Sequence, residues 1–360
     1  MDFTINRYHR LLNTLRNQGF SFVNLKDNLH FPLSRSIIIR HDVDMLPENS
    51  LEFARLQNAI GIKGTYYFRA VPESWNEKII KEVANLGHEI GYHYEDLGAT
   101  AQRIKGTKAQ WHKDSIGNRL RDLETNGRRD NIHGPQDRKT ARPQDHRHLE
   151  KELVNITIVS FSENLEKLRK IAPVKTICMH GSPMSRWDSR LLWKYYDYRD
   201  FGIIGEPYFD INFDEVLYLT DTGRRWDSDA VSVRDKVMGQ GEGEKRRRGE
   251  WAKSNPFENW KVKPFKYREN NSSSPLHPLT PSPHLPVPPS PGPPLTPSQY
   301  KFHSTSDIIK ASGNNQLPDK IMMTFHPQRW TDKPLPWVKE LLWQNVKNVG
   351  KYFLLKVRSE

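Results

Sequence analysis

The sequence predicts an α/β protein in which about seven parallel strands alternate with helices as a (β/α) barrel. Short runs of β-branched and aromatic residues alternate with amphipathic segments, a pattern typical of parallel strands joined by crossover helices. Once two polar segments are set aside, about 250 residues remain, the usual size of a barrel. No G-x-G-x-x-G follows the first strong strand, which disfavours the competing doubly wound sheet.

The amino-terminal part supplies the first β/α units. A helix is expected around residues 8–12, followed by a short strand at 20–25. Ile37, Ile38 and Ile39 open the first strong strand, which runs into ionisable side chains. The next elements expected are helices at 48–60 and 75–86 and strands at 64–69 and 90–93.

Two polar segments interrupt this alternation, at residues 98–148 and 238–300. The first contains few apolar residues that could be buried. In the second, residues 271–300 hold 11 of the 25 prolines of the chain. We therefore expect one domain over residues 1–350 that carries two disordered insertions. Outside them the sequence predicts helices at 162–171, 189–196, 305–311 and 337–349 and strands at 174–179, 202–204, 216–219 and 320–325.

Charge and cysteine content limit the function classes. The formal net charge is +12, but residues 101–150 hold 12 Lys/Arg against 7 Asp/Glu, and residues 239–300 hold 9 against 5. Because this excess lies in the two insertions and no aromatic residues interleave with it, we expect no nucleic-acid partner. Cys178 is the single cysteine, and neither a secretory signal nor a spanning segment is visible, so we expect a cytoplasmic protein without a membrane partner.

Ionisable residues follow several of the predicted strands. Asp42 and Asp44 share one face of an extended chain at the end of the first strong strand. His93, His180 and His326 each stand where a later apolar run stops. In either α/β architecture these strand ends meet at one ligand-binding edge. Imidazole and carboxylate together bind zinc and similar divalent metals, so the pattern predicts a metal site.

At these residues the chain resembles the polysaccharide deacetylase superfamily, the NodB-homology fold of carbohydrate esterase family 4-like enzymes. The matching pieces are IIIRHDVD, GHEIGYHYEDL and MMTFHPQRW, and the HDVD and CMHGSP segments are similar to an intracellular branch. The resemblance covers most of residues 35–97, 150–235 and 300–350. It implies a NodB-like barrel and metal-dependent removal of an N-acyl group, or less readily an O-acyl group, from a carbohydrate.

The resemblance also implies residue roles. Asp42 would be the general base, Asp44 and His93 metal ligands, and His326 the acid that protonates the leaving amine. Asp221 is expected to orient that histidine. Val43 separates two aspartates that are adjacent in the family, so the roles of Asp42 and Asp44 could be exchanged.

Other positions depart further from the family pattern. Leu97 stands where the family has its second metal histidine, so either Glu95 or His180 must supply the third ligand, and we favour His180. The family has an arginine that keeps the base ionised and that has no clear counterpart in this chain. Arg69 is expected to take its place. The residues expected near the substrate are Tyr208, Arg329, Trp330 and Glu95; for Trp330, packing against helices is the alternative to sugar stacking.

The expected function is therefore hydrolysis of an N-acyl group on a carbohydrate or nucleotide-sugar-type substrate, with zinc as the expected metal. The absence of a visible signal favours an intracellular glycan precursor. One alternative is a catalytically silent barrel that binds glycan or a partner in surface-polysaccharide biosynthesis. Another is hydrolysis of a non-sugar amide.

Overall fold

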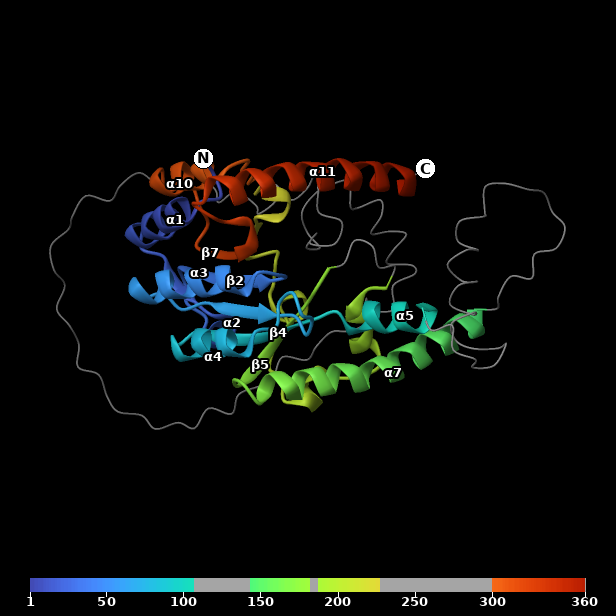
Figure 1. Ribbon diagram of the computed structural model, residues 1–360. Coiled ribbons are helices and arrows are strands. Elements are labelled where there is room, and N and C mark those ends of the chain that lie inside the picture. Colours follow the sequence, from blue (N-terminus) through green and yellow to red (C-terminus); the bar gives the residue numbers. More distant parts are fainter. Residues whose placement is uncertain (107–142, 182–186, 227–299, 360) are drawn as a thin grey trace, which may run out of the picture.

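The computed structural model describes residues 1–106, 143–181, 187–226 and 300–359 (Figure 1). Its seven strands form one parallel sheet in the order β5-β4-β3-β2-β7-β6, and β1 pairs with the amino-terminal part of β2. The strands are β1 (Ser21–Val23), β2 (Ser36–Val43), β3 (Thr65–Phe68), β4 (Glu89–Tyr94), β5 (Val174–Met179), β6 (Leu217–Thr220) and β7 (Lys320–Phe325). The expected α/β class is confirmed.

Helices connect successive strands and cover the outside of the sheet (Figure 1). The α-helices are α1 (Ile5–Asn17), α2 (Leu25–His30), α3 (Pro47–Ala59), α4 (Glu77–Asn85), α5 (Asp96–Gly106), α7 (Pro143–Arg169), α8 (Pro207–Asp210), α10 (Thr305–Gly313) and α11 (Pro334–Ser359). Short 3₁₀ segments are η1 (Ser189–Lys194), η2 (Tyr198–Phe201), η3 (Thr222–Arg224) and η6 (Pro327–Arg329).

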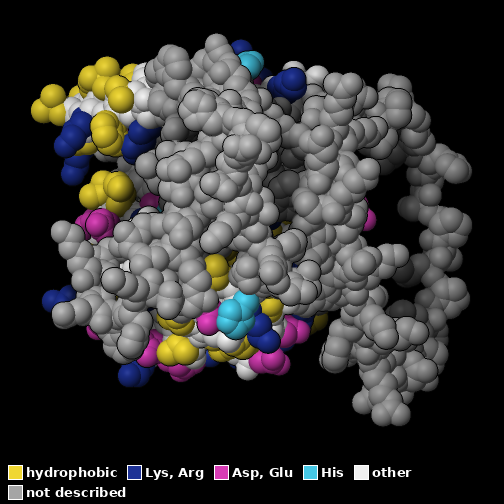
Figure 2. Space-filling model, turned by 90° about the vertical axis from the view of Figure 1, so that its right-hand side faces the viewer, with side chains coloured by type: hydrophobic (Ala, Val, Ile, Leu, Met, Phe, Trp, Pro, Cys, Tyr) yellow, Lys and Arg dark blue, Asp and Glu magenta, His cyan; other side chains and the backbone are white. Residues whose placement is uncertain are grey.

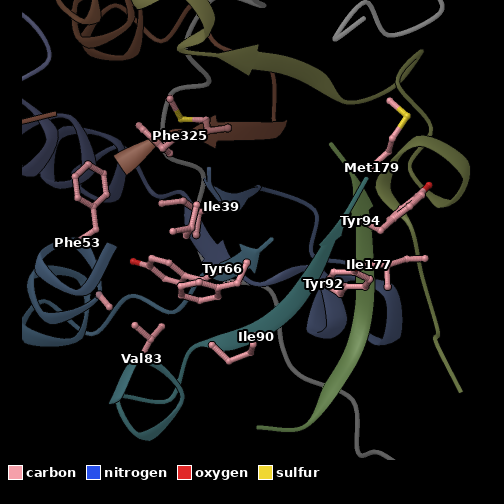
Figure 3. Packing of buried hydrophobic residues seen from close by; sticks show 14 of the residues in the cluster. Ile39, Phe53, Tyr66, Val83, Ile90, Tyr92, Tyr94, Ile177, Met179 and Phe325 are labelled. Atoms are coloured by element: carbon pink, nitrogen blue, oxygen red, sulfur yellow. The ribbon is translucent and has the colours of Figure 1, made fainter. Parts of the chain in front are cut away.

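The apolar runs form strands because both faces of the sheet are covered. All eight residues of β2 are buried, as is typical of a central parallel strand. Outward-facing side chains such as Ile39, Tyr66 and Ile90 pack against the surrounding helices (Figure 3). A smaller inner cluster joins Ile38 and Tyr67 to Cys178 of β5 and Tyr218 of β6.

This inner cluster contains residues from both ends of the sheet, so the sheet curves around it. Within the described residues no pairing joins β5 to β6, and the sheet is therefore open. The fold is consistent with a barrel-like arrangement, whereas a closed barrel is not observed.

Helix α2 lies at the amino-terminal end of the strands. Its first backbone N–H groups bond to strand side chains: Leu25 donates to Thr65 Oγ1 at 2.8 Å, and Lys26 donates to Glu89 Oε2 at 3.0 Å. Leu25 itself is buried in the inner cluster. Since α2 covers this end, the opposite edge, where the carboxyl ends of the strands lie, is the one at which a ligand is expected.

Two parts of the sequence-based assignment are wrong. Residues 98–106 and 143–148 of the first expected insertion are helical, in α5 and α7, and the helix expected at 162–171 is only the end of α7. Leu153, Val154 and Phe161 are buried along α7, so this charged helix does contribute to the core. The strand expected at 202–204 is absent; a single bridge joins Thr176 to Gly205. Residues 107–142 and 238–299 lie outside the described residues.

Candidate metal centre

Three side chains from different strand ends form a candidate metal site. Asp44 follows β2, His93 lies in β4, and His180 follows β5. Their ligand atoms all lie within 4.8 Å of one another. The Nε2 atoms of His93 and His180 are each 3.6 Å from Asp44 Oδ1. Two imidazoles and one carboxylate suit zinc and leave a coordination position open.

The hydrogen bonding of the three groups fits such an ion. Asp44 Oδ1 is buried and has no hydrogen-bond partner in the described structure, which is costly unless something else compensates its charge. His93 donates from Nδ1 to the carbonyl of Cys178 at 2.9 Å. This bond leaves its Nε2 lone pair directed at Asp44, the tautomer that a metal ligand needs.

His180 is oriented by a carboxylate. Its Nδ1 donates to Glu95 Oε2 at 2.9 Å, and Glu95 Oε1 accepts from Arg69 Nη2 at 2.6 Å. Arg69 also donates to the backbone carbonyl of Asp44 at 3.0 Å. Of the two residues considered for the third ligand, His180 is therefore the one in the cluster, and Glu95 orients it. The expected contact of Glu95 with a substrate stays a prediction.

Arg69 does not pair with Asp42, contrary to the sequence-based expectation. Arg40 does, through two bonds: Nε to Oδ1 at 2.7 Å and Nη2 to Oδ2 at 2.6 Å. Residues 40 and 42 point to the same face of β2, and both are buried. This alternation is visible in the sequence and could have identified Arg40.

The electrostatics of the cluster favour an ionised Asp44 beside a neutral His93. Burial by itself would raise the pKa of Asp44, but His180, His326 and His93 outweigh it and hold this pKa well below its usual value. Burial lowers the pKa of His93 to about 4, so its ring is neutral near pH 7. For Asp42, burial is likewise outweighed, chiefly by Arg40, and its pKa is lowered.

His326 lies on the side of Asp44 opposite the two histidine ligands. Its Nε2 is 3.9 Å from Asp44 Oδ2, and its Nδ1 donates to Asp221 Oδ1 at 2.5 Å. Burial and Arg329 lower the pKa of His326, but Asp221 and Asp44 outweigh them and raise it above its ordinary value. Asp221 thus orients this imidazole and stabilises its charged form.

Trp330 and Arg329 also contact Asp221. Trp330 Nε1 donates to Asp221 Oδ2 at 2.6 Å, and Arg329 Nη1 donates to Oδ1 at 3.0 Å. The indole ring of Trp330 is fully buried, so the stacking platform expected at this residue is wrong and packing is observed. Arg329 likewise bonds to Asp221, and its expected contact with a substrate stays a prediction.

Tyr208, in α8, is partly buried. Its ring lies 5.8 Å from the Arg40 guanidinium and 5.5 Å from that of Arg190. This position is close to the Arg40–Asp42 pair, and the expected contact of Tyr208 with a substrate stays a prediction.

Gln328 was not identified from the sequence. Its Nε2 donates to Asp44 Oδ2 at 3.0 Å, which leaves Oδ1 as the oxygen nearest both imidazoles. Its Oε1 is buried without a hydrogen-bond partner among the described residues. Only its place two residues after His326 could have indicated a role.

Comparisons with protein-family models, curated proteins and solved structures found no match for this chain. What can be concluded about the site therefore comes from its geometry, in which Asp44, His93 and His180 lie close enough to hold a metal ion.

Proposed function

We propose that the chain is a metal-dependent hydrolase that removes an N-acyl group, in the simplest case acetyl, from a carbohydrate or glycan precursor. The observation that carries this proposal is the position of the Asp44–His93–His180 cluster between two further ionisable groups. Asp42 Oδ2 lies 3.6 Å from His93 Nε2 on one side, and His326 Nε2 lies 3.9 Å from Asp44 Oδ2 on the other. A base and an acid thus flank one ion site.

Asp44, His93 and His180 would hold the ion, most suitably zinc. Such an ion would polarise an amide carbonyl and lower the pKa of water, so that a water could lose its proton and attack the carbonyl near neutral pH. Asp42 is the proposed proton acceptor for that water. Arg40 keeps its carboxylate ionised, and Oδ2 lies 3.6 Å from His93 Nε2, close to where the ion would be held.

His326 is the proposed general acid. Cleavage of the C–N bond leaves electron density on nitrogen, and a proton must reach that atom before the amine departs. Asp221 raises the pKa of His326, so that the imidazole carries a proton at higher pH than a free histidine would.

The substrate class rests on the resemblance of IIIRHDVD, GHEIGYHYEDL and MMTFHPQRW to the polysaccharide deacetylase superfamily. The same resemblance supports a NodB-like barrel as the finer description of the curved sheet. A cytoplasmic location and a substrate from an intracellular glycan precursor are part of this proposal.

A second candidate is a silent barrel that binds glycan or a biosynthetic partner. The observation that favours it is the engagement of both Asp42 oxygens by Arg40. A carboxylate held in this way is a weaker base than a free one, because protonation would break an ion pair.

Acetate release distinguishes the two candidates. Zinc-loaded protein is incubated with a panel of N-acetylated amino sugars and with non-sugar acetamides, beside His326→Ala and the control His303→Ala, an exposed histidine on the segment before α10. A hydrolase releases acetate from the sugars, retains this activity in His303→Ala and loses it in His326→Ala, while ligand binding persists. Binding of sugars without any acetate release would support the silent barrel, and release from the acetamides alone would identify an amidase.

A further inference from the structure

Helix α11 exposes apolar side chains and turns polar ones toward the body. Exposed fractions reach 83 % at Leu335, 61 % at Leu342 and 63 % at Val346. In contrast, Gln344 is 3 % exposed, and Asn348 donates to the carbonyl of Gly223 at 3.1 Å. A surface helix usually exposes polar side chains and turns its apolar side to the core, so the exposed apolar side chains of α11 are unusual.

The exposed side chains form one continuous strip. Leu335, Val338, Leu342 and Val346 follow each other at intervals of three or four residues, so they lie on one side of the helix. Trp343 adjoins them and is 56 % exposed. We call these five residues the α11 strip. Figure 2 shows hydrophobic side chains with basic ones beside them at the upper left of one face of the molecule.

The charges next to the α11 strip are mostly positive. Lys339 is exposed, and it stands four residues after Leu335 and three before Leu342, on the same side of the helix as the strip. Lys347 lies beside Trp343, with its Nζ 5.2 Å from the ring centre. The acid Glu340 is only partly exposed and belongs to the charges around Arg224.

The remainder of the α11 sequence continues this bias. It contributes Lys351, Lys356 and Arg358 and has no acid before Glu360. The whole helix is therefore basic as well as apolar, the composition of a segment that lies on a membrane surface.

A second copy of the chain would fit the α11 strip less well than an anionic membrane surface would. A symmetric pair of such helices would bury Lys339 of each copy against an apolar side that offers it no acid, and an unpaired buried charge is strongly unfavourable. An anionic bilayer has no such penalty. The lysine stem can lie among the acyl chains while its ammonium reaches the phosphates, and each lysine near the surface adds about 1 kcal/mol of attraction.

We propose that α11 binds the surface of an anionic membrane, with the α11 strip in the interface and Lys339 at the lipid headgroups. No helix in the described ranges has the length and apolar character to cross a bilayer, and surface binding needs none. The sequence-based expectation of no membrane partner considered only such a crossing. This proposal is independent of catalysis.

Helix α11 lies near the edge of the sheet that carries the candidate metal centre. Helix α11 begins five residues after Arg329 and runs past the carboxyl ends of the strands (Figure 1). Because the α11 strip faces away from the body, α11 itself would lie between the bilayer and the edge of the sheet that carries Asp44 and His326.

Vesicle sedimentation tests the proposal on the full chain. Vesicles of phosphatidylcholine alone are compared with vesicles that also contain phosphatidylglycerol, at low and high salt. The variants are Leu342→Glu/Val346→Glu and Lys339→Glu, and the control is Phe31→Glu, since Phe31 is 77 % exposed after α2, away from α11. Unfolding midpoints in urea verify that each variant is folded.

We expect wild type and Phe31→Glu to bind the anionic vesicles at least about tenfold more tightly than the neutral ones. The double variant should lose binding to both, and Lys339→Glu should lose part of the preference for anionic lipid. Equal binding by folded Leu342→Glu/Val346→Glu and wild type would overturn the proposal. So would light scattering that shows a wild-type dimer, free of lipid, which the double variant dissociates.

Discussion

Arg40 and Asp42 form a buried two-point ion pair on one face of β2, two residues apart. The pair adjoins the candidate metal centre, because Asp42 Oδ2 is also 3.6 Å from His93 Nε2. The attraction between the two charges offsets the free-energy cost of removing them from water, and it does so only while both are present. The stability of the sheet and the ionisation of the proposed base therefore depend on the same contact.

Arg40→Met should destabilise the fold by about 3–5 kcal/mol, since it leaves the Asp42 carboxylate buried and unpaired. Urea denaturation measures this loss. Arg55→Met is the control, because its pair with Glu82 is exposed and should contribute about 1 kcal/mol or less. Adding Asp42→Leu to Arg40→Met should recover part of the loss. Equal losses in the two single variants would contradict a buried pair.

Asp44→Ala should abolish zinc retention, and Glu95→Gln should lower zinc affinity by about tenfold or more, because a neutral amide holds His180 less firmly than a carboxylate does. Competition with a chromophoric chelator measures both. Glu163→Gln, on the exposed side of α7, is the matched control and should bind zinc like wild type. Unchanged affinity in Asp44→Ala would disprove the assigned ligand set.

Asp221→Asn should lower the pKa of His326 in the metal-free protein. Burial and Arg329 both disfavour the imidazolium, and Asp221 is the main group that outweighs them. Because the folded pKa of His326 is raised, its stabilising contribution is complete below pH about 6.5 and disappears as pH rises through the folded value. NMR titration of the ring protons should show this pKa falling below that of a free histidine in the variant; a pKa that stays raised would exclude Asp221 as the cause.

Glu206 should make stability depend on pH. Burial raises the pKa of this carboxyl from 4.5 to about 7, against hydrogen bonds from the backbone N–H groups of Met179 and Tyr208. A raised folded pKa means that stability is complete below pH 4.5 and falls as pH rises through about 7, by up to about 3 kcal/mol. Urea midpoints across this range should fall in wild type and change less in Glu206→Gln. Glu166→Gln, at an exposed position, should retain the wild-type profile.

The strand positions and the convergence of Asp44, His93 and His180 could be predicted because both follow from local rules. Buried parallel strands appear as short apolar runs, and polar residues that end such runs meet at one edge. His326 and Asp221 were found in the same way. None of these inferences needed the partner of any side chain to be known.

The sequence did not show which ionisable side chains pair with one another. Arg69 and Arg40 both adjoin Asp42 in a parallel sheet, and only the side-chain directions show that Arg40 takes the carboxylate while Arg69 turns to Glu95. The helical content of α5 and α7 was missed because charged and polar residues are frequent there, so the apolar pattern was weak. Closure of a barrel depends on long-range strand pairing, which no local pattern encodes.

Arg69 connects the loop that carries Asp44 to the carboxylate that holds His180. The relative placement of two ligands is thus maintained by bonds within the polypeptide, whether or not the position between them is filled. A site that forms without its ion would allow the ion to exchange, unlike a zinc finger, whose folding depends on the metal. The identity of the ion in a living cell would then follow supply and exchange as much as the shape of the site.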